Sequence, residues 1–140
     1  MYLDTSVAVA IYAHEPDSAA LEAILRDGDG FFSSELLRGE IAGALFAKEK
    51  NKVISTKVRA DIMAKLEEHL AEGTVQLIPL HNLLVVEAME LMAQVYPDVL
   101  LRTLDAVHLA TCLSVDAGPL FTRDKRMLAA ARKLGIPLAG

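Results

Sequence analysis

The sequence has no tryptophan and one cysteine, and only 5% of its 140 residues are aromatic. The single cysteine, Cys112, cannot form a disulfide within the chain, and its apolar neighbours indicate a buried thiol instead of a catalytic nucleophile. No apolar run approaches the ~20 residues that a membrane-spanning helix needs. The N-terminus also lacks the basic start and long apolar stretch of a signal peptide. We therefore expect a soluble, cytoplasmic protein that does not enter a membrane.

The sequence has no excess of positive charge. Its net charge is -5, whereas a simple nucleic-acid-binding protein usually carries a basic face. This charge does not exclude an enzyme whose acids are neutralised by metal ions. A hydrophobic content of 53% in 140 residues suits one compact domain, which we expect to span residues 1–140.

Short apolar segments alternate with segments of helical periodicity along the chain. This alternation predicts an α/β fold, a three-layer sandwich whose mostly parallel sheet of four to five strands is covered by helices on both faces. Pro137 restricts the last strand to an edge of the sheet. Strands are predicted at residues 1–4, 31–32, 75–80, 119–122 and 136–139. The helix N-caps predicted by residue type are Thr5 or Ser6, Ser55, Asn82 and Asp124, and the predicted helix stops are Gly73 and Gly135.

Four acidic residues are candidates for one site at the edge of this sheet. Asp4 ends the first apolar segment, and ligands of open α/β sheets bind outside the carboxyl ends of the strands. Asp4 could also simply begin a helix, Asp105 could complement a helix dipole, and Asp124 could be an ordinary N-cap. Glu40 lies past the first turn of its helix, so capping cannot explain it.

The neighbours of two of these acids add weight to them. Glu40 stands between Gly39 and Gly43, and a glycine inside a helix costs about 1 kcal/mol relative to alanine. The two glycines suggest a close approach of backbone or ligand, with loose helix packing as the alternative. Asp105 lies on a helix that is apolar almost all round, so its charge needs a cation, a donor or an opening to solvent. His108, on the same face, could be a metal ligand or, more often for such a residue, part of the core.

Carboxylates that converge repel one another, so they must share protons or bind cations. Sites made only of oxygen ligands select hard ions, which favours magnesium or manganese over zinc. Such an ion can hold a phosphodiester and lower the pKa of a bound water for attack. The pattern therefore predicts metal-dependent hydrolysis of a phosphate ester.

The segments that carry these acids resemble the PIN-domain ribonucleases, and most closely the VapC-type toxins of type II toxin/antitoxin pairs. Their order and spacing agree with that family along essentially the whole chain. The four segments are Tyr2-Leu3-Asp4-Thr5-Ser6, Ser34-Glu35-Leu36-Leu37-Arg38-Gly39-Glu40, Leu104-Asp105-Ala106-Val107-His108-Leu109-Ala110 and Phe121-Thr122-Arg123-Asp124.

The resemblance implies an endoribonuclease that depends on Mg²⁺ or Mn²⁺. By that similarity the direct metal ligands are Asp4 and Asp105, followed by Glu40, while Asp124 can act through water. Ser6 and Thr122 would support the site. The resemblance also implies a homodimer and a VapB-type antitoxin whose tail occupies the groove beside the acids. The implied substrates are structured RNAs, chiefly loops of transfer RNA or ribosomal RNA.

Three arginines, Arg38, Arg102 and Arg123, lie close in sequence to the proposed ligands. They could contact RNA phosphates, although an arginine in such a position is more often an ordinary surface residue. Two other functions remain open at this point. An aspartate-dependent phosphatase would need a second acid where Ser6 stands, and a receiver-like domain would need an acidic pair and a late lysine. A catalytically silent PIN-like interaction module would usually have lost some of its acids.

Overall fold

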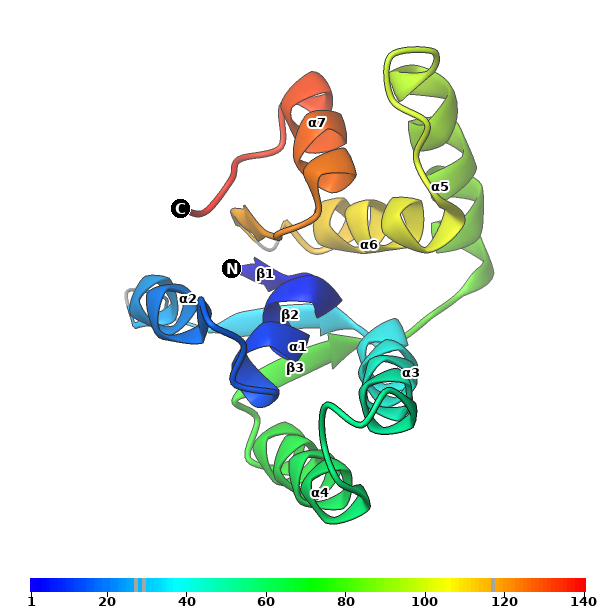
Figure 1. Cartoon of the computed structure of the whole chain (residues 1–140). Helices are drawn as coiled ribbons and strands as arrows, with labels where there is room; N and C mark the ends of the chain where they lie inside the picture. Colours follow the sequence, from blue (N-terminus) through cyan, green and yellow to red (C-terminus); the bar gives the residue numbers. More distant parts are fainter. Residues whose placement is uncertain (27, 29, 117) are drawn as a thin grey trace.

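The computed structural model describes residues 1–26, 28, 30–116 and 118–140, and its parallel sheet lies between two layers of helices (Figure 1). The strands run in the order β3-β2-β1-β4, and every pairing is parallel. Leu138 adds one parallel bridge to Leu120 in place of the full last strand that was predicted. The predicted α/β architecture is confirmed. The strands are β1 (Tyr2–Leu3), β2 (Phe31–Ser34), β3 (Val75–Ile78) and β4 (Leu120–Phe121).

The helices divide between the two faces of the sheet. In Figure 1, α5, α6 and α7 cover one face, and α1 to α4 cover the other. None of the helices in the described ranges is both long enough and apolar enough to cross a membrane. The helices are α1 (Thr5–Tyr12), α2 (Ser18–Leu25), α3 (Leu36–Lys50), α4 (Thr56–Ala71), α5 (Asn82–Val95), α6 (Thr103–Ser114) and α7 (Lys125–Leu134).

Successive side chains of a strand point to opposite faces of the sheet. Helices cover both faces, so both sets of side chains of the central strands are buried. Tyr2 and Leu120 pack in the cluster formed with α5, α6 and α7. Leu3 and Phe121, the next residues, pack in the cluster on the other face. The layers therefore meet at β1 and β4, the two strands that lead directly to Asp4 and Asp124.

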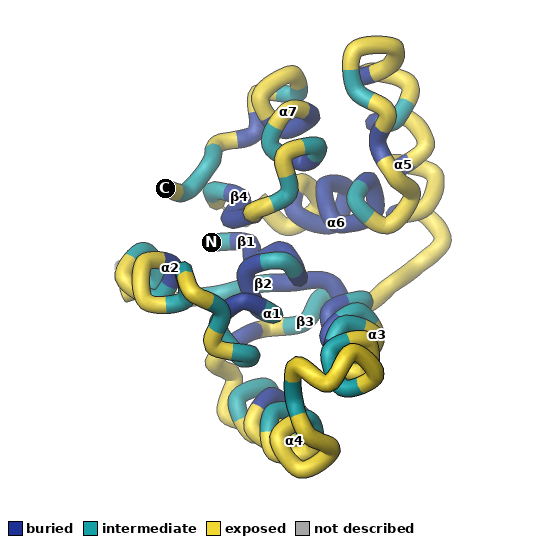
Figure 2. The backbone as a smooth tube through the Cα atoms, in the orientation of Figure 1, coloured by how far each residue is buried: buried dark blue, intermediate teal, exposed yellow. Residues whose placement is uncertain are grey.

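Helix α6 is the most deeply buried helix segment next to the sheet, and Figure 2 shows its middle almost entirely in the buried colour. Its seven successive residues 106–112 are all buried. This confirms the prediction from its apolar sequence. Cys112 is a buried thiol, as predicted, and burial raises its pKa to about 11.

The start of α1 differs from the prediction. Asp4, and not Thr5 or Ser6, is the N-cap, because its carboxylate accepts the backbone N–H of Ser6, two residues later. The carboxylate of Asp4 is therefore fixed by the first turn of α1.

The start of α5 also differs from the prediction. The N-cap position belongs to His81, so Asn82 is already the first helical residue, and no side chain caps this helix.

Other helix ends agree with the sequence. The Ser55 hydroxyl accepts the N–H of Val58 at the start of α4. Gly73 follows α4 and Gly135 ends α7, and both have the left-handed backbone that glycine adopts without steric cost (φ +75° and +71°). The ends of these two helices therefore follow from the residue type at one position.

The structure shows no close approach of backbone at Gly39 or Gly43, so this part of the prediction is wrong and the alternative of loose helix packing is confirmed. A Cβ at either position would meet no atom within 4 Å, and both residues lie on the exposed side of α3. The opposite side of the helix buries Leu37, Ile41 and Leu45. The glycines therefore leave an open strip on α3 instead of a packed contact.

Candidate active site

Three aspartates meet at the carboxyl edge of the sheet. Asp4 directly follows β1, and Asp124 lies three residues beyond the neighbouring parallel strand β4. Asp105 stands in the first turn of α6. Burial raises the pKa of Asp105, and the negative charges of Asp124 and then Asp4 raise it further. The structure thus brings these three predicted residues into one electrostatic environment.

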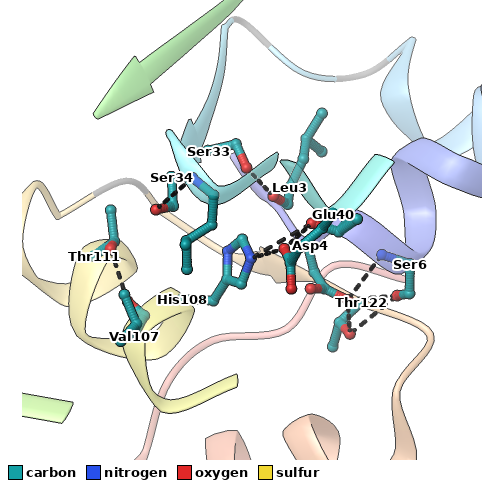
Figure 3. A network of polar contacts seen from close by, with 12 residues as sticks. Leu3, Asp4, Ser6, Ser33, Ser34, Glu40, Val107, His108, Thr111 and Thr122 are labelled. Carbon is teal, nitrogen blue, oxygen red and sulfur yellow. Dashed lines mark hydrogen bonds and ion pairs between the residues drawn. The ribbon is translucent and has the colours of Figure 1, made fainter. Parts of the chain in front are cut away.

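Asp4 is held firmly through one of its two carboxylate oxygens (Figure 3). Oδ2 accepts the Ser6 N–H at 3.2 Å, the Ser6 hydroxyl at 2.5 Å and the Thr122 hydroxyl at 2.8 Å. In the described part of the chain, no hydrogen bond involves Oδ1. Ser6 and Thr122 therefore lie where a supporting role requires them, and Asp4 keeps one oxygen for a ligand.

Asp124 is both an N-cap and a neighbour of the other acids. Its Oδ1 accepts the backbone N–H of Arg126 at 2.7 Å and of Met127 at 3.1 Å. Its own N–H donates to the Thr122 hydroxyl at 3.0 Å. The capping explanation is therefore correct, but it uses only one oxygen of the side chain. Capping fixes the carboxylate and leaves Oδ2 for another contact.

Glu40 joins the group through two intermediaries. Its Oε2 accepts the Thr5 hydroxyl at 2.5 Å and Nε2 of His108 at 2.7 Å. Burial alone would raise the pKa of Glu40, but the hydrogen bonds from His108 and Thr5, with the attraction to the His108 ring, hold it below its ordinary value. Glu40 is therefore an ionised carboxylate, tied to the residue after Asp4 and to the helix that carries Asp105.

Asp105 is the acid whose environment is least satisfied. Its Oδ2 is buried, and it has no hydrogen-bond partner among the residues that the structure describes. A buried carboxylate oxygen without a donor costs about 1–3 kcal/mol or more, which a cation would remove. This orphaned oxygen and the all-oxygen donor set fit a divalent hard cation.

The acids do not form a closed cage. Within the described ranges, no set of three or more His, Cys, Asp or Glu side chains is arranged to hold a metal ion. Mg²⁺ usually keeps several waters and binds through one or two carboxylates. Two direct carboxylates with water between the ion and the others therefore fit this arrangement better than four direct ligands.

The predicted arginines separate into two groups. Arg38 pairs with Glu67 at 3.1 Å, and Arg123 pairs with Glu15 at 2.7 Å and Asp17 at 2.9 Å. These carboxylates compete with any phosphate for the two guanidinium groups. The structure therefore gives less support to Arg38 and Arg123 as RNA contacts than their sequence positions suggested.

Arg102 fits the expected position better, because its positive charge partly offsets the burial and the acidic neighbours that raise the pKa of Asp105. Arg126 acts in the same way, although sequence reasoning did not select it. The sequence did contain an indication for Arg126, because this residue stands in the first turn of the helix that Asp124 caps. Thr5 was considered only as a cap and His108 mainly as a core residue, yet both hold Glu40.

Comparison with known proteins agrees with this site. The sequence matches the PIN domain family over residues 1–133, so the chain belongs to the PIN-domain family. It is 34% identical, over 140 residues, to Ribonuclease VapC46 of Mycobacterium tuberculosis (strain ATCC 25618 / H37Rv). The match covers 97% of this chain and 93% of that protein. The predicted resemblance to VapC-type PIN-domain ribonucleases is confirmed.

Proposed function

We propose that this protein is the toxin of a type II toxin/antitoxin pair and that it hydrolyses phosphodiester bonds within RNA with bound Mg²⁺ or Mn²⁺. The observation that carries the proposal is the buried Oδ2 of Asp105, which has no partner in the described part of the chain and lies near Asp4 and Asp124. Membership of the PIN-domain family and the similarity to a ribonuclease support the activity.

Each acid has a separate task in this proposal. Asp4 and Asp105 bind the ion directly, Glu40 completes the site, and Asp124 acts directly or through water. When bound, the ion lowers the pKa of a water and stabilises charge on the phosphate. Ser6 and Thr122 keep the Asp4 carboxylate in place, so the ligand does not have to be ordered when the ion binds.

The substrate side of the proposal depends on positive charge near the acids. Arg102 and Arg126 both act electrostatically on Asp105, and this nearness to the acids makes them the proposed contacts for RNA phosphates. Arg123 and Arg38 would have to leave their carboxylate partners first. We propose structured RNA, such as loops of transfer RNA or ribosomal RNA, as the substrate. A VapB-type antitoxin, a homodimer and a cytoplasmic location complete the proposal.

The experiment is RNA cleavage by the purified chain with Mg²⁺, with Mn²⁺ and with excess chelator. We expect cleavage only with a metal, and we expect Asp4→Asn and Asp105→Asn to abolish it while the fold survives. Asp61→Asn is the matched control, because Asp61 is exposed on α4 and its ion pair within the described residues is with Lys57. Full activity in excess chelator, or in both site variants, would refute the proposal. Sequencing RNA ends after induction would identify the target.

A further inference from the structure

A buried chain of hydrogen bonds runs beneath Glu40 and connects three elements. The Tyr2 hydroxyl on β1 lies 2.8 Å from Nδ1 of His108 on α6, and Nε2 of His108 lies 2.7 Å from Oε2 of Glu40 on α3. Tyr2 is 0% exposed and His108 1% exposed. The two rings also pack edge to face, with centroids 5.9 Å apart. Figure 3 shows the His108 ring directed at Glu40.

The direction of these hydrogen bonds follows from the chemistry of the groups. A carboxylate oxygen accepts hydrogen bonds, so Nε2 of His108 is the donor to Oε2 of Glu40. The Tyr2 hydroxyl, which can donate or accept, forms the hydrogen bond to Nδ1 on the other side of the ring. The two partners therefore engage both ring nitrogens and fix the orientation of the imidazole.

This arrangement answers the question that the sequence left open about His108. Both ring nitrogens are occupied, Nδ1 by Tyr2 and Nε2 by Glu40, so neither is available to ligate a metal. The second donor to Glu40, the Thr5 hydroxyl, contacts the same oxygen, Oε2, at 2.5 Å. Two donors on one oxygen leave Oε1 as the oxygen of Glu40 that can face an ion.

We propose that His108 is a positioning residue for the metal site: held by Tyr2, it fixes the Glu40 carboxylate so that Oε1 is presented to the ion. This inference rests on the proposed function, because it requires a divalent cation among the acids. Groups that orient a metal ligand typically change metal affinity or activity by about 10- to 100-fold when they are removed. His108 acts through Glu40 and does not touch the reacting atoms.

The test is a calorimetric titration of the purified full-length chain with Mn²⁺ in the absence of RNA. We expect His108→Ala to weaken Mn²⁺ binding by about 10- to 100-fold. His108→Gln should restore most of the affinity, because its amide N–H can reach the position of Nε2. His108→Asn should not, because its shorter amide reaches only the position of Nδ1.

The matched control is His69→Ala. His69 on α4 forms the same kind of pair, in which Tyr12 Oη lies 2.8 Å from its Nδ1, but it contacts none of the four acids. We expect His69→Ala to bind Mn²⁺ like the wild type. In RNA cleavage, His108→Ala should need about 10- to 100-fold more Mn²⁺ for half-maximal rate and approach the wild-type rate at saturation. A loss of rate at every Mn²⁺ concentration would instead indicate a general structural role and overturn the inference.

Other outcomes also decide the matter. Wild-type affinity in both His108→Ala and His108→Gln would overturn the inference and leave the proposed function standing. If His108→Ala fails to fold, the comparison of Gln with Asn decides, and equal affinities overturn the inference. A wild-type protein that binds Mn²⁺ but cleaves no RNA would refute the proposed nuclease activity. The role of His108 would then be decided by the Mn²⁺ titrations alone. A wild-type protein that binds no Mn²⁺ would overturn both.

Discussion

The Thr122 hydroxyl donates to Oδ2 of Asp4 at 2.8 Å, although the two residues stand 118 positions apart in the chain. The same hydroxyl accepts the backbone N–H of Asp124 at 3.0 Å. One side chain at the end of β4 therefore connects the acid that follows β1 with the acid that begins α7. The relative position of these two carboxylates depends on it.

Replacing Thr122 with valine keeps the shape of the side chain and removes both hydrogen bonds. The N–H of Asp124 then loses its partner, so we expect the free energy of unfolding to fall by about 1–3 kcal/mol. Mn²⁺ binding should weaken as well, because Asp4 is less firmly held. Thr122→Ser, which keeps the hydroxyl, is the control in denaturant unfolding and Mn²⁺ titration. Equal stability of the two variants would contradict this role.

Asp105→Asn should stabilise the metal-free protein at pH 7 by an amount on the order of 1 kcal/mol. Burial and the charges of Asp124 and Asp4 raise the pKa of Asp105 in the folded state, so its ionised form opposes folding. The difference from Asp105→Asn should shrink as the pH falls through this raised pKa and disappear below the unfolded-state pKa. Denaturant unfolding with chelator at several pH values measures it, with Asp61→Asn as control. A variant less stable than the wild type at pH 7 would show that the charge supports the fold.

Glu15→Gln should have the opposite pH dependence. Hydrogen bonds from Lys48 and then Arg123, both at 2.7 Å, hold the pKa of Glu15 below its ordinary value. Its stabilisation is therefore complete above its unfolded-state pKa and lost as the pH falls through the folded-state pKa. We expect a loss of about 1 kcal/mol at pH 7 that shrinks in acid. The measurement is denaturant unfolding at several pH values, with Glu68→Gln as the control because Glu68 is an exposed acid. A loss of stability that does not depend on pH would exclude the ion pairs as its cause.

Gly39→Ala and Gly43→Ala should each raise the free energy of unfolding by about 1 kcal/mol. Both positions are helical and open, and an added Cβ meets no atom within 4 Å. Gly73→Ala is the contrasting control, because φ of +75° is strained for alanine, and we expect it to destabilise the protein. Denaturant unfolding of the three variants gives the result. Destabilisation by Gly39→Ala or Gly43→Ala would mean that the strip on α3 is not open in solution.

Much of this molecule follows from local sequence. The alternation of apolar strands with periodic helices gave the α/β fold, and the apolar surroundings of Asp105 indicated that its carboxylate is partly buried. Caps were less certain, because Asp4, Thr5 and Ser6 all favour an N-cap and differ only in their place along the chain. The predicted close approach of backbone at Gly39 and Gly43 was wrong, because a glycine pattern does not state which side of a helix faces a neighbour.

The sequence by itself placed Asp4 and Asp124 at the carboxyl edge of the sheet, because each follows an apolar strand of a parallel sheet. Only the tertiary structure decided which oxygens are held and which are left free. The pairing of Arg123 with Glu15 and the contact of His108 with Glu40 join segments 108 and 68 positions apart. Helical and strand periodicities assign a face to a residue, but the partner across that face depends on how distant elements pack.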